Sequence, residues 1–245
     1  MKRFSLTVLM LLVAVTCRVG AEDEWRTTAA AYLWSAGIDG ETAVIRDEPL
    51  DIDASATDIF EKLQFTLMGF IGFHNDDWLI FGEVFYWDLK VEDIDTPEDV
   101  YGDAEVDIRF GNLSLGASRR LRFEDFEIDP YISLRYWRLS VDLDLDAGTM
   151  PARGADDEKN WNDLSLGLRM QKPLSDRWFV SGWVSTNIEG DSDDFIDFFA
   201  GMNYRRSENR EIIFGVRHQE VHYDSGDFRF DVELSGPLVG LIFRL

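Results

Sequence analysis

Apolar residues alternate with polar or small residues along segments of about ten residues, and this period of two constrains the fold more than any other feature. Successive side chains of a β-strand point to opposite faces. In one segment the apolar set and the set opposing it are Leu164, Leu166, Leu168 and Met170 against Asp163, Ser165, Gly167, Arg169 and Gln171. In a second they are Ile196, Phe198, Ala200, Met202 and Tyr204 against Asp197, Phe199, Gly201, Asn203 and Arg205. Strands with one lipid face and one lumen face have this pattern.

Helices cannot provide the membrane crossing in the body of this sequence. After residue 21 the longest stretch without a charged residue is Leu63 to Asn75, with 13 residues. A helix that spans a membrane needs about 20. Any crossing must therefore be made by strands, and the length suits one all-β domain over residues 22–245.

The strand pattern predicts an antiparallel transmembrane β-barrel of about ten strands, with about 8 or 12 as alternatives. The expected strands lie near residues 25–35, 63–73, 78–90, 104–121, 127–143, 163–171, 177–189, 196–205, 211–223 and 227–245. Tight connections near residues 74–76, 123–126, 175–176 and 207–209 would lie at the periplasmic end. Long connections at 36–62, 91–103, 144–160 and 190–194 would face outward. The first long connection should contain one short helix, Asp58 to Leu63.

Two of the expected strands change the parity of their apolar residues. One change falls at Gly111-Asn112 and the other at Gly236-Pro237. Glycine and proline are tolerated at β-bulges, which shift the phase of a strand by one residue. We therefore predict a bulge at each position.

The N-terminus has the three parts of a secretory signal. Lys2 and Arg3 precede an apolar run of 14 residues that ends at Cys17, and Ala21 provides a small residue for cleavage. The run is too short for a spanning helix. We expect residues 1–21 to be removed. Removal takes away three basic residues and no acidic one, so the net charge changes from −23 to −26, and it also removes the one cysteine.

This charge and the loss of the cysteine exclude several functions. Nucleic acids are bound by clustered Lys and Arg, so we expect no nucleic-acid partner. Without Cys17 the mature chain has no disulfide, thiolate nucleophile or Cys-ligated metal. We expect no cofactor. The expected partners are outer-membrane lipid, the barrel assembly machinery with periplasmic chaperones, and a small-molecule ligand that the sequence does not identify.

The C-terminal strand carries the clearest local pattern, because its apolar residues alternate up to the last residue: Val239, Leu241, Phe243 and Leu245. This pattern is typical of the strand that closes a barrel against the first strand. An aromatic last residue would be the usual one for recognition by the assembly machinery, and Leu245 departs from that.

Several short motifs, in order along the chain, resemble a poorly characterised family of bacterial outer-membrane β-barrel proteins. They are Tyr32-Leu33-Trp34 with Gly37-Ile38-Asp39-Gly40, Trp161-Asn162-Asp163 with Gly167-Leu168-Arg169, Phe214-Gly215-Val216-Arg217 with Tyr223, and Gly236-Pro237-Leu238-Val239-Gly240-Leu241. The resemblance implies an outer-membrane barrel and supplies no catalytic residues.

Strand phase places a set of charged residues in the expected lumen: Glu83, Arg135, Asp163, Arg169, Asp197, Arg205 and Arg217. A buried charge is tolerated when it has a partner, so we expect these residues to pair. The side chains of a barrel of about eight to ten strands fill most of its interior. A plugged barrel or a narrow channel is therefore favoured over an open pore.

Histidines and acidic clusters are the other candidate functional groups. His218, Glu220 and His222 share one strand face, a combination that suits zinc. Their phase puts them outside the lumen near the outer rim, so we expect surface residues and no metal. His74 should lie in a solvated turn. The acidic groups should be solvated outer loops, namely Asp142, Asp144 and Asp146, then Asp156, Asp157 and Glu158, then Asp191, Asp193 and Asp194.

The function expected from these features is that of a non-enzymatic component of the outer membrane, a porin-like narrow channel or a small-ligand-binding barrel. One alternative is an outer-membrane hydrolase that acts on lipid or peptide at the rim. Such an enzyme needs a nucleophile, a base and an orienting group. Ser165, Ser181 and Ser185 can face inward, but no histidine shares their expected layer. The other alternative is a soluble periplasmic β-sandwich or lipocalin-like carrier.

The signal prediction can be checked on the native protein. Mass spectrometry of the chain purified from the cell envelope should give a mature N-terminus at Glu22. An intact Met1, or a lipid attached to Cys17, would contradict it.

Overall fold

The computed structural model describes residues 24–43, 50–91, 101–147, 151–226 and 228–245. The signal prediction falls on residues outside these ranges. Strands dominate the described chain: β1 Arg26–Trp34, β2 Gly37–Ala43, β3 Leu50–Ala54, β4 Leu63–His74, β5 Trp78–Val91, β6 Tyr101–Arg119, β7 Leu121–Arg122, β8 Glu127–Ala147, β9 Arg153–Pro173, β10 Trp178–Gly190, β11 Asp194–Ser207, β12 Arg210–Asp224 and β13 Arg229–Arg244. One short helix, α2, spans Ala56–Lys62. All ten predicted strands are present.

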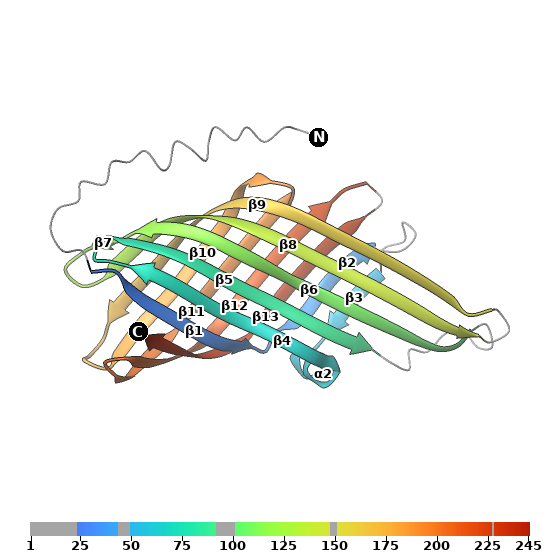
Figure 1. Ribbon diagram of the computed structural model, residues 1–245, viewed down its shortest axis with the longest axis horizontal. Coiled ribbons are helices and arrows are strands. Elements are labelled where there is room, and N and C mark those ends of the chain that lie inside the picture. Colours follow the sequence, from blue (N-terminus) through green and yellow to red (C-terminus); the bar gives the residue numbers. More distant parts are fainter. Residues whose placement is uncertain (1–23, 44–49, 92–100, 148–150, 227) are drawn as a thin grey trace.

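Ten strands form a closed antiparallel barrel in the order β1, β4, β5, β6, β8, β9, β10, β11, β12, β13 (Figure 1). The pairing of β13 with β1 closes it, which confirms the predicted barrel and its strand number. The connections at 75–77, 123–126, 174–177 and 208–209 lie at the end of the barrel that holds the C-terminus. Among the described residues, no helix has the length and apolar composition needed to cross a membrane.

The closing strand β13 has the faces that the sequence predicts. It pairs with β1 from Leu238 opposite Trp34 to Arg244 opposite Thr28. The side chains of Val239, Leu241 and Phe243 point outward and are exposed, as is the terminal Leu245. The described backbone of the barrel wall therefore has a hydrogen-bonded neighbour on both sides, which a lipid environment requires.

The first long connection contains more structure than predicted. β2 follows β1 and pairs with the same neighbouring strand, β13. β3 then pairs antiparallel with β2, so the two form a hairpin. Helix α2 then leads into β4 and buries Ile59 against the barrel interior. The Ser55 hydroxyl and backbone N–H donate to the Asp58 carboxylate and hold the pKa of that carboxyl below its ordinary value. This capping box fixes the start of the helix.

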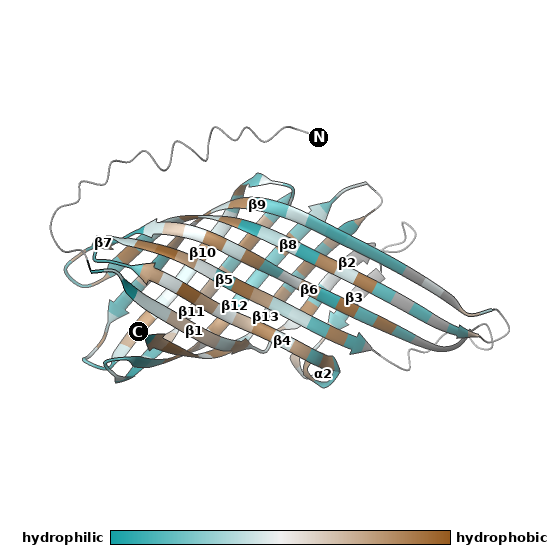
Figure 2. Cartoon of the chain, in the orientation of Figure 1, coloured by the Kyte–Doolittle hydropathy of each residue, from teal (hydrophilic) through white to brown (hydrophobic). Residues whose placement is uncertain are grey.

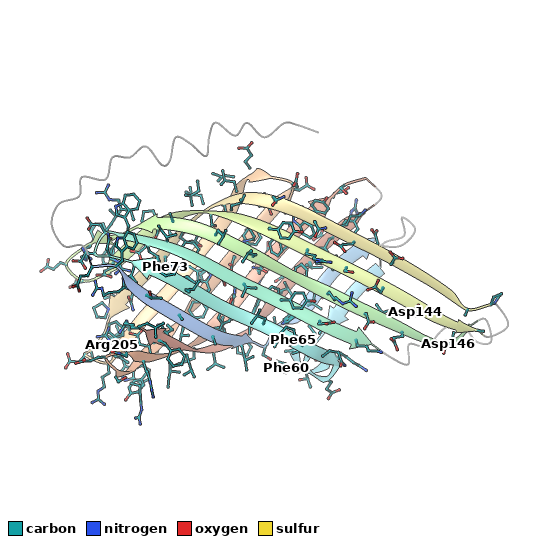
Figure 3. The ribbon with its side chains drawn as sticks, in the orientation of Figure 1. Phe60, Phe65, Phe73, Asp144, Asp146 and Arg205 are labelled. Carbon is teal, nitrogen blue, oxygen red and sulfur yellow. The ribbon has the colours of Figure 1, made fainter. Side chains whose placement is uncertain are left out.

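A belt of exposed apolar side chains surrounds the middle of the barrel (Figure 2). It includes Leu33, Leu67, Ile71, Ile80, Leu113, Leu115, Leu134, Leu166, Leu168, Met170, Val184, Ile196, Phe198, Phe214, Val216, Val239 and Leu241. Exposed aromatic residues flank the belt. On β4 they are Phe73 at the end nearer the short connections and Phe65 at the other end (Figure 3). An apolar band between aromatic girdles is the surface that a bilayer contacts.

The two predicted bulges are absent, because neither strand changes phase. The pairing of β6 with β5 and β8 runs through Gly111-Asn112 without a shift, and that of β13 with β12 runs through Gly236-Pro237 in the same way. In β6 the inward face is apolar at Phe110 and polar at Asn112 and Ser114. The apparent parity change marks a change in the polarity of the lumen.

The strands extend well beyond the belt, which corrects the prediction of a long loop at 144–160. β8 and β9 have 21 residues each, whereas about 9–11 are enough to cross a bilayer. Asp142, Asp144, Asp146 and the group Asp156 to Glu158 therefore lie on strands. Figure 3 shows Asp144 and Asp146 near the far end of β8. Asp191 and Asp193 remain in a connection.

The assignment of faces predicts that β9 tolerates an outward-facing arginine beyond the belt but not within it. Leu168 is half-exposed in the belt, and a charge near the membrane midplane costs about 2–4 kcal/mol. Leu168→Arg should therefore reduce the yield of folded barrel in liposomes, measured by the shift in gel mobility. Asn160→Arg is the matched control, because Asn160 lies on the same outward face of β9 beyond the belt. Equal folding of the two variants would contradict the assignment.

Candidate functional site

A buried ion pair lies at the centre of the lumen. Arg217 on β12 donates to both carboxylate oxygens of Asp197 on β11, from Nε at 2.9 Å and Nη2 at 2.8 Å. Both side chains are almost completely buried, with exposures of 1%. A two-point arrangement matches the planar guanidinium to the carboxylate and is among the stronger hydrogen-bonded pairs. The sequence predicted both residues in the lumen, and the structure brings them together.

Glu83 extends the pair across the barrel. Its carboxylate accepts from Nη1 of Arg217 at 3.0 Å and from the Tyr32 hydroxyl at 2.6 Å. The Arg217 guanidinium also lies over the rings of Trp34 and Trp183, at 5.0 and 5.6 Å. Cation–π contacts of this kind stabilise a desolvated cation. The cluster therefore joins β1, β5, β10, β11 and β12 across the lumen.

Arg135 reaches the same carboxylate from β8. Its Nη2 lies 3.5 Å from Asp197, and its guanidinium stacks over the Phe195 ring at 4.2 Å. Nε and Nη1 of Arg135 are buried and have no hydrogen-bond partner among the described residues. A buried donor without a partner is costly unless water or a ligand supplies one. This cation therefore retains unused hydrogen-bonding capacity.

Asp163 does not join the charge network, which differs from the prediction. It is fully buried on β9 and accepts hydrogen bonds from the Trp137 indole and from the Ser192 backbone and hydroxyl, all at 2.8–2.9 Å. Three donors can hold a carboxylate without a cation. Asp163 therefore anchors the connection between β10 and β11 to the barrel wall.

Arg169 and Arg205 face inward as predicted but lie outside the central cluster. Arg169 stacks on the rings of Phe70, Phe81 and Tyr131 at 5.3–5.7 Å, and within the described chain it has no ion pair. Arg205 lies at the end of the barrel with the short connections (Figure 3), where it stacks on Phe179 and pairs with Glu211 at 3.4 Å.

Aromatic side chains close the lumen on the side of the long connections. Trp137 stacks between Phe110 and Trp161, each at 5.7 Å between ring centroids, and Phe230 lies at 5.1 Å from Phe110. Trp34, Phe85, Trp87, Phe195 and Phe228 belong to the same buried cluster. We call this cluster the aromatic plug. Such close packing leaves no room for a continuous water-filled pore through this half.

The other half of the lumen holds a cavity of about 270 Å³, which we call the vestibule. Its wall includes Tyr131, Trp183, Arg135, Arg169 and Ser133, with Glu83 of the central cluster. Several lining charges are neutralised locally: Arg120 pairs with Glu127 and Asp129, and Arg244 with Glu211. Arg169 has no such partner among the described residues, so its guanidinium is the lining cation that a bound anion could pair with.

Sequence reasoning missed the neutral members of this site. Tyr32, Trp34 and Trp183 belong to inward strand positions, so their phase could have identified them. His74 was expected in a solvated turn, but it is the last residue of β4, lines the vestibule and lies 3.1 Å from the Thr28 hydroxyl. Ser165 and Ser185 are buried as expected. Within the described chain, no ion pair joins His74 to a carboxylate.

Comparison with solved structures identifies the architecture. The outer membrane protease OmpT from Escherichia coli superposes with a TM-score of 0.61 at 8% identity, covering 91% of this chain and 97% of that one. The fold is that of a bacterial outer-membrane β-barrel. The translocator domain of NalP from Neisseria meningitidis gives 0.43 at 13% identity, with 92% and 90% covered. Ail of Yersinia pestis, in complex with a heparin analogue, gives 0.39 at 11%, with 91% and 100% covered.

No protein-family model matches the sequence, and no curated protein matches it. At 8% identity the likeness to the protease shows the fold alone. The residues of this outer-membrane barrel must therefore supply any argument about its activity.

Because the Arg217–Asp197 pair is buried, substitution of Arg217 should destabilise the barrel much more than substitution of Arg205. Arg217→Leu leaves Asp197 and Glu83 with less compensation in a buried layer, and breaking a buried pair typically costs about 3–5 kcal/mol. The Arg205 side chain is about a third exposed, so Arg205→Leu should cost under about 1 kcal/mol. Urea unfolding of each barrel in liposomes measures the difference. Equal losses would show that the central cluster contributes no more than an ion pair at the rim.

Proposed function

We propose that the protein is a non-enzymatic barrel of the outer membrane that binds a small anionic ligand in its vestibule. The short connections would face the periplasm, as in other barrels of this type, so the vestibule would open toward that compartment. The apolar face of β13 would be presented to the barrel assembly machinery during insertion. The exposed belt contacts outer-membrane lipid in this proposal.

The division of the lumen carries the proposal. The aromatic plug and the Arg217–Asp197 pair fill the half beneath the long connections, and the vestibule occupies the other half. A pocket open at one end suits binding better than diffusion across the membrane. This division therefore favours the ligand-binding hypothesis over the narrow channel.

The groups that line the vestibule indicate the class of ligand. Arg169 provides a guanidinium without a carboxylate partner in the described chain, above three aromatic rings. Arg135 is a second guanidinium in the wall of the vestibule, and its Nε and Nη1 have no hydrogen-bond partner among the described residues. Guanidinium groups bind carboxylate and phosphate in a two-point geometry, and aromatic walls suit an apolar or planar body. We therefore propose an organic anion with such a body.

Of the two other hypotheses from the sequence, the soluble carrier is less well supported, and the hydrolase stays the alternative. A soluble carrier would expose to water the continuous belt of Leu, Ile, Val and Phe side chains, far more than the few hundred Å² that soluble monomers typically expose. A hydrolase needs a nucleophile whose base is held by a third group. In the vestibule the His74 contact given above is with Thr28, and Ser181 donates to Asn203 at 2.5 Å. On the outer wall His218 lies 2.6 Å from the Ser235 hydroxyl and 2.8 Å from Glu220, so the hydrolase hypothesis rests on this group.

Calorimetric titration with benzoate, a small aromatic anion, tests the vestibule. The detergent-folded barrel should bind benzoate saturably, and Arg169→Gln should weaken binding at least about tenfold. A hydrogen bond to a charged group contributes about 1.5–3 kcal/mol, and about 1.4 kcal/mol corresponds to a factor of ten. Arg205→Gln is the control, because Arg205 does not line the cavity.

Benzamide has nearly the same shape as benzoate without the charge, so it should bind more weakly than benzoate. Equal affinity for the two probes, or benzoate binding that is independent of Arg169, would contradict the proposal. A steady ion conductance of the unmodified barrel in planar bilayers would instead favour the channel hypothesis.

A further inference from the structure

The outer wall of the barrel carries a row of carboxylates just beyond the apolar belt, over β12, β13 and β2. On β12 the last apolar residue of this face is Val216, and His218 and Glu220 follow it. In the register of the sheet, Glu220 lies directly opposite Glu233 on β13, and Glu233 lies directly opposite Asp39 on β2. Three acidic residues therefore occupy one line across three adjacent strands.

Like charges that lie directly opposite each other destabilise a sheet, because their Cβ atoms are only about 4.5–5.5 Å apart. The next line of the same face repeats the pattern with Asp231 opposite Glu41. Beyond the belt, and within the part of the chain that the structure describes, His218, His222 and Arg229 are the basic residues of this face on β12 and β13. This register is an arrangement that a bound cation would stabilise.

His218 precedes Glu220 by two residues on the same face of β12, opposite Ser235, and contacts two carboxylates of the first line. Its Nε2 is 2.8 Å from a carboxylate oxygen of Glu220, and its Nδ1 is 3.4 Å from Glu233. One ligand atom from each of the three side chains lies within 4.8 Å of the other two. The residues come from two adjacent strands of a closed barrel, so the backbone already fixes the spacing of their Cα atoms. Little conformational entropy needs to be lost when the three converge on an ion.

We propose that His218, Glu220 and Glu233 form a binding site for a divalent transition-metal ion of the Zn²⁺ type on the outer wall of the barrel. One imidazole and two carboxylates are a ligand set that Zn²⁺ accepts, with a further position left for water. The Ser235 hydroxyl lies 2.6 Å from Nδ1 of His218. A partner on one ring nitrogen orients the imidazole and leaves the other ring nitrogen for the ion.

The histidine distinguishes this ion from the hard cations. Ca²⁺ and Mg²⁺ are bound by oxygen ligands, and Ca²⁺ takes about six to eight of them. The cluster supplies carboxylate oxygens from two residues and a nitrogen from a third, which suits Zn²⁺.

Calorimetric titration of the untagged, chelator-stripped barrel in detergent with zinc chloride tests the site. We expect saturation at one Zn²⁺ per chain. His218→Ala and Glu233→Gln should each lower the affinity by at least about tenfold, since even residues that only orient a metal ligand typically change affinity about 10- to 100-fold. The gel mobility of each variant, compared with that of the unmodified chain, shows that the barrel has folded.

His222→Ala is the matched control. His222 lies on the same face of the same strand, but the one ion pair that it makes within the described ranges is with Asp231, at 2.8 Å. Its removal should change the Zn²⁺ affinity less than about twofold, well below the change expected from losing a ligand. An equal effect of His218→Ala and His222→Ala would overturn the proposal. So would the absence of Zn²⁺ binding, or Ca²⁺ binding of equal strength that does not depend on His218, because each would leave only a diffuse acidic surface.

Discussion

The hydrogen bonds between β13 and β1 are the interaction on which the rest of the structure depends. Backbone groups in a bilayer have no water to bind, so an open edge of the sheet would leave several unsatisfied groups, each at a cost of several kcal/mol. Closure fixes which residues face inward, because a shift of one residue would reverse every side chain of a strand. Arg217 and Asp197 are brought together in the lumen only because the neighbouring strands β11 and β12 keep this register.

The central cluster separates two environments within the closed lumen. Arg217 can be buried because Asp197 and Glu83 neutralise it and because Trp34 and Trp183 contact its guanidinium. On one side of this layer the aromatic plug excludes water, and on the other side the vestibule admits it. The same strands therefore change the character of their inward face along their length, from apolar at Phe110 to polar at Ser114.

That change explains where prediction from the sequence succeeded and where it failed. The period of two identified all ten barrel strands and both faces of β9 and β11, since lipid on one side enforces a regular pattern. The same rule predicted bulges at Gly111 and Gly236 because it assumed a uniformly polar lumen. It also missed the strands at 144–147 and 153–160: beyond the bilayer the outward face is charged, so the apolar signal disappears.

The candidate site was predicted in part for a related reason. Strand phase assigns a side chain to the lumen, and all seven charged residues that were predicted to face inward do so. Phase says nothing about which of these residues share a layer, because that depends on strand tilt and register. Four of the seven form one cluster of ion pairs: Arg217, Asp197, Glu83 and Arg135. Asp163 instead accepts hydrogen bonds from Trp137 and Ser192. Strand phase likewise did not predict the contact between Glu233 and His218, because the two residues are 15 positions apart along the chain.

Basic side chains compensate the acidic residues unevenly over the part of the barrel beyond the belt. Over β6, β8 and β9 some outward acids lie opposite acids, as in Asp107–Asp142 and Asp142–Asp156. Arginine and lysine side chains on β5, β6 and β8 nevertheless pair with outward acids there, as in Lys90–Glu105, Arg109–Asp142 and Arg138–Glu158. Over β2, β13 and β12 acids also lie opposite acids, and the ion pairs described there are made by His218, His222 and Arg229. Exposed pairs contribute at most about 1 kcal/mol each, so stability does not require this pairing. The side over β2, β13 and β12, where histidines supply most of the described ion pairs, is therefore the part of the outer wall whose electrostatic free energy depends most on the cations of the surrounding solution.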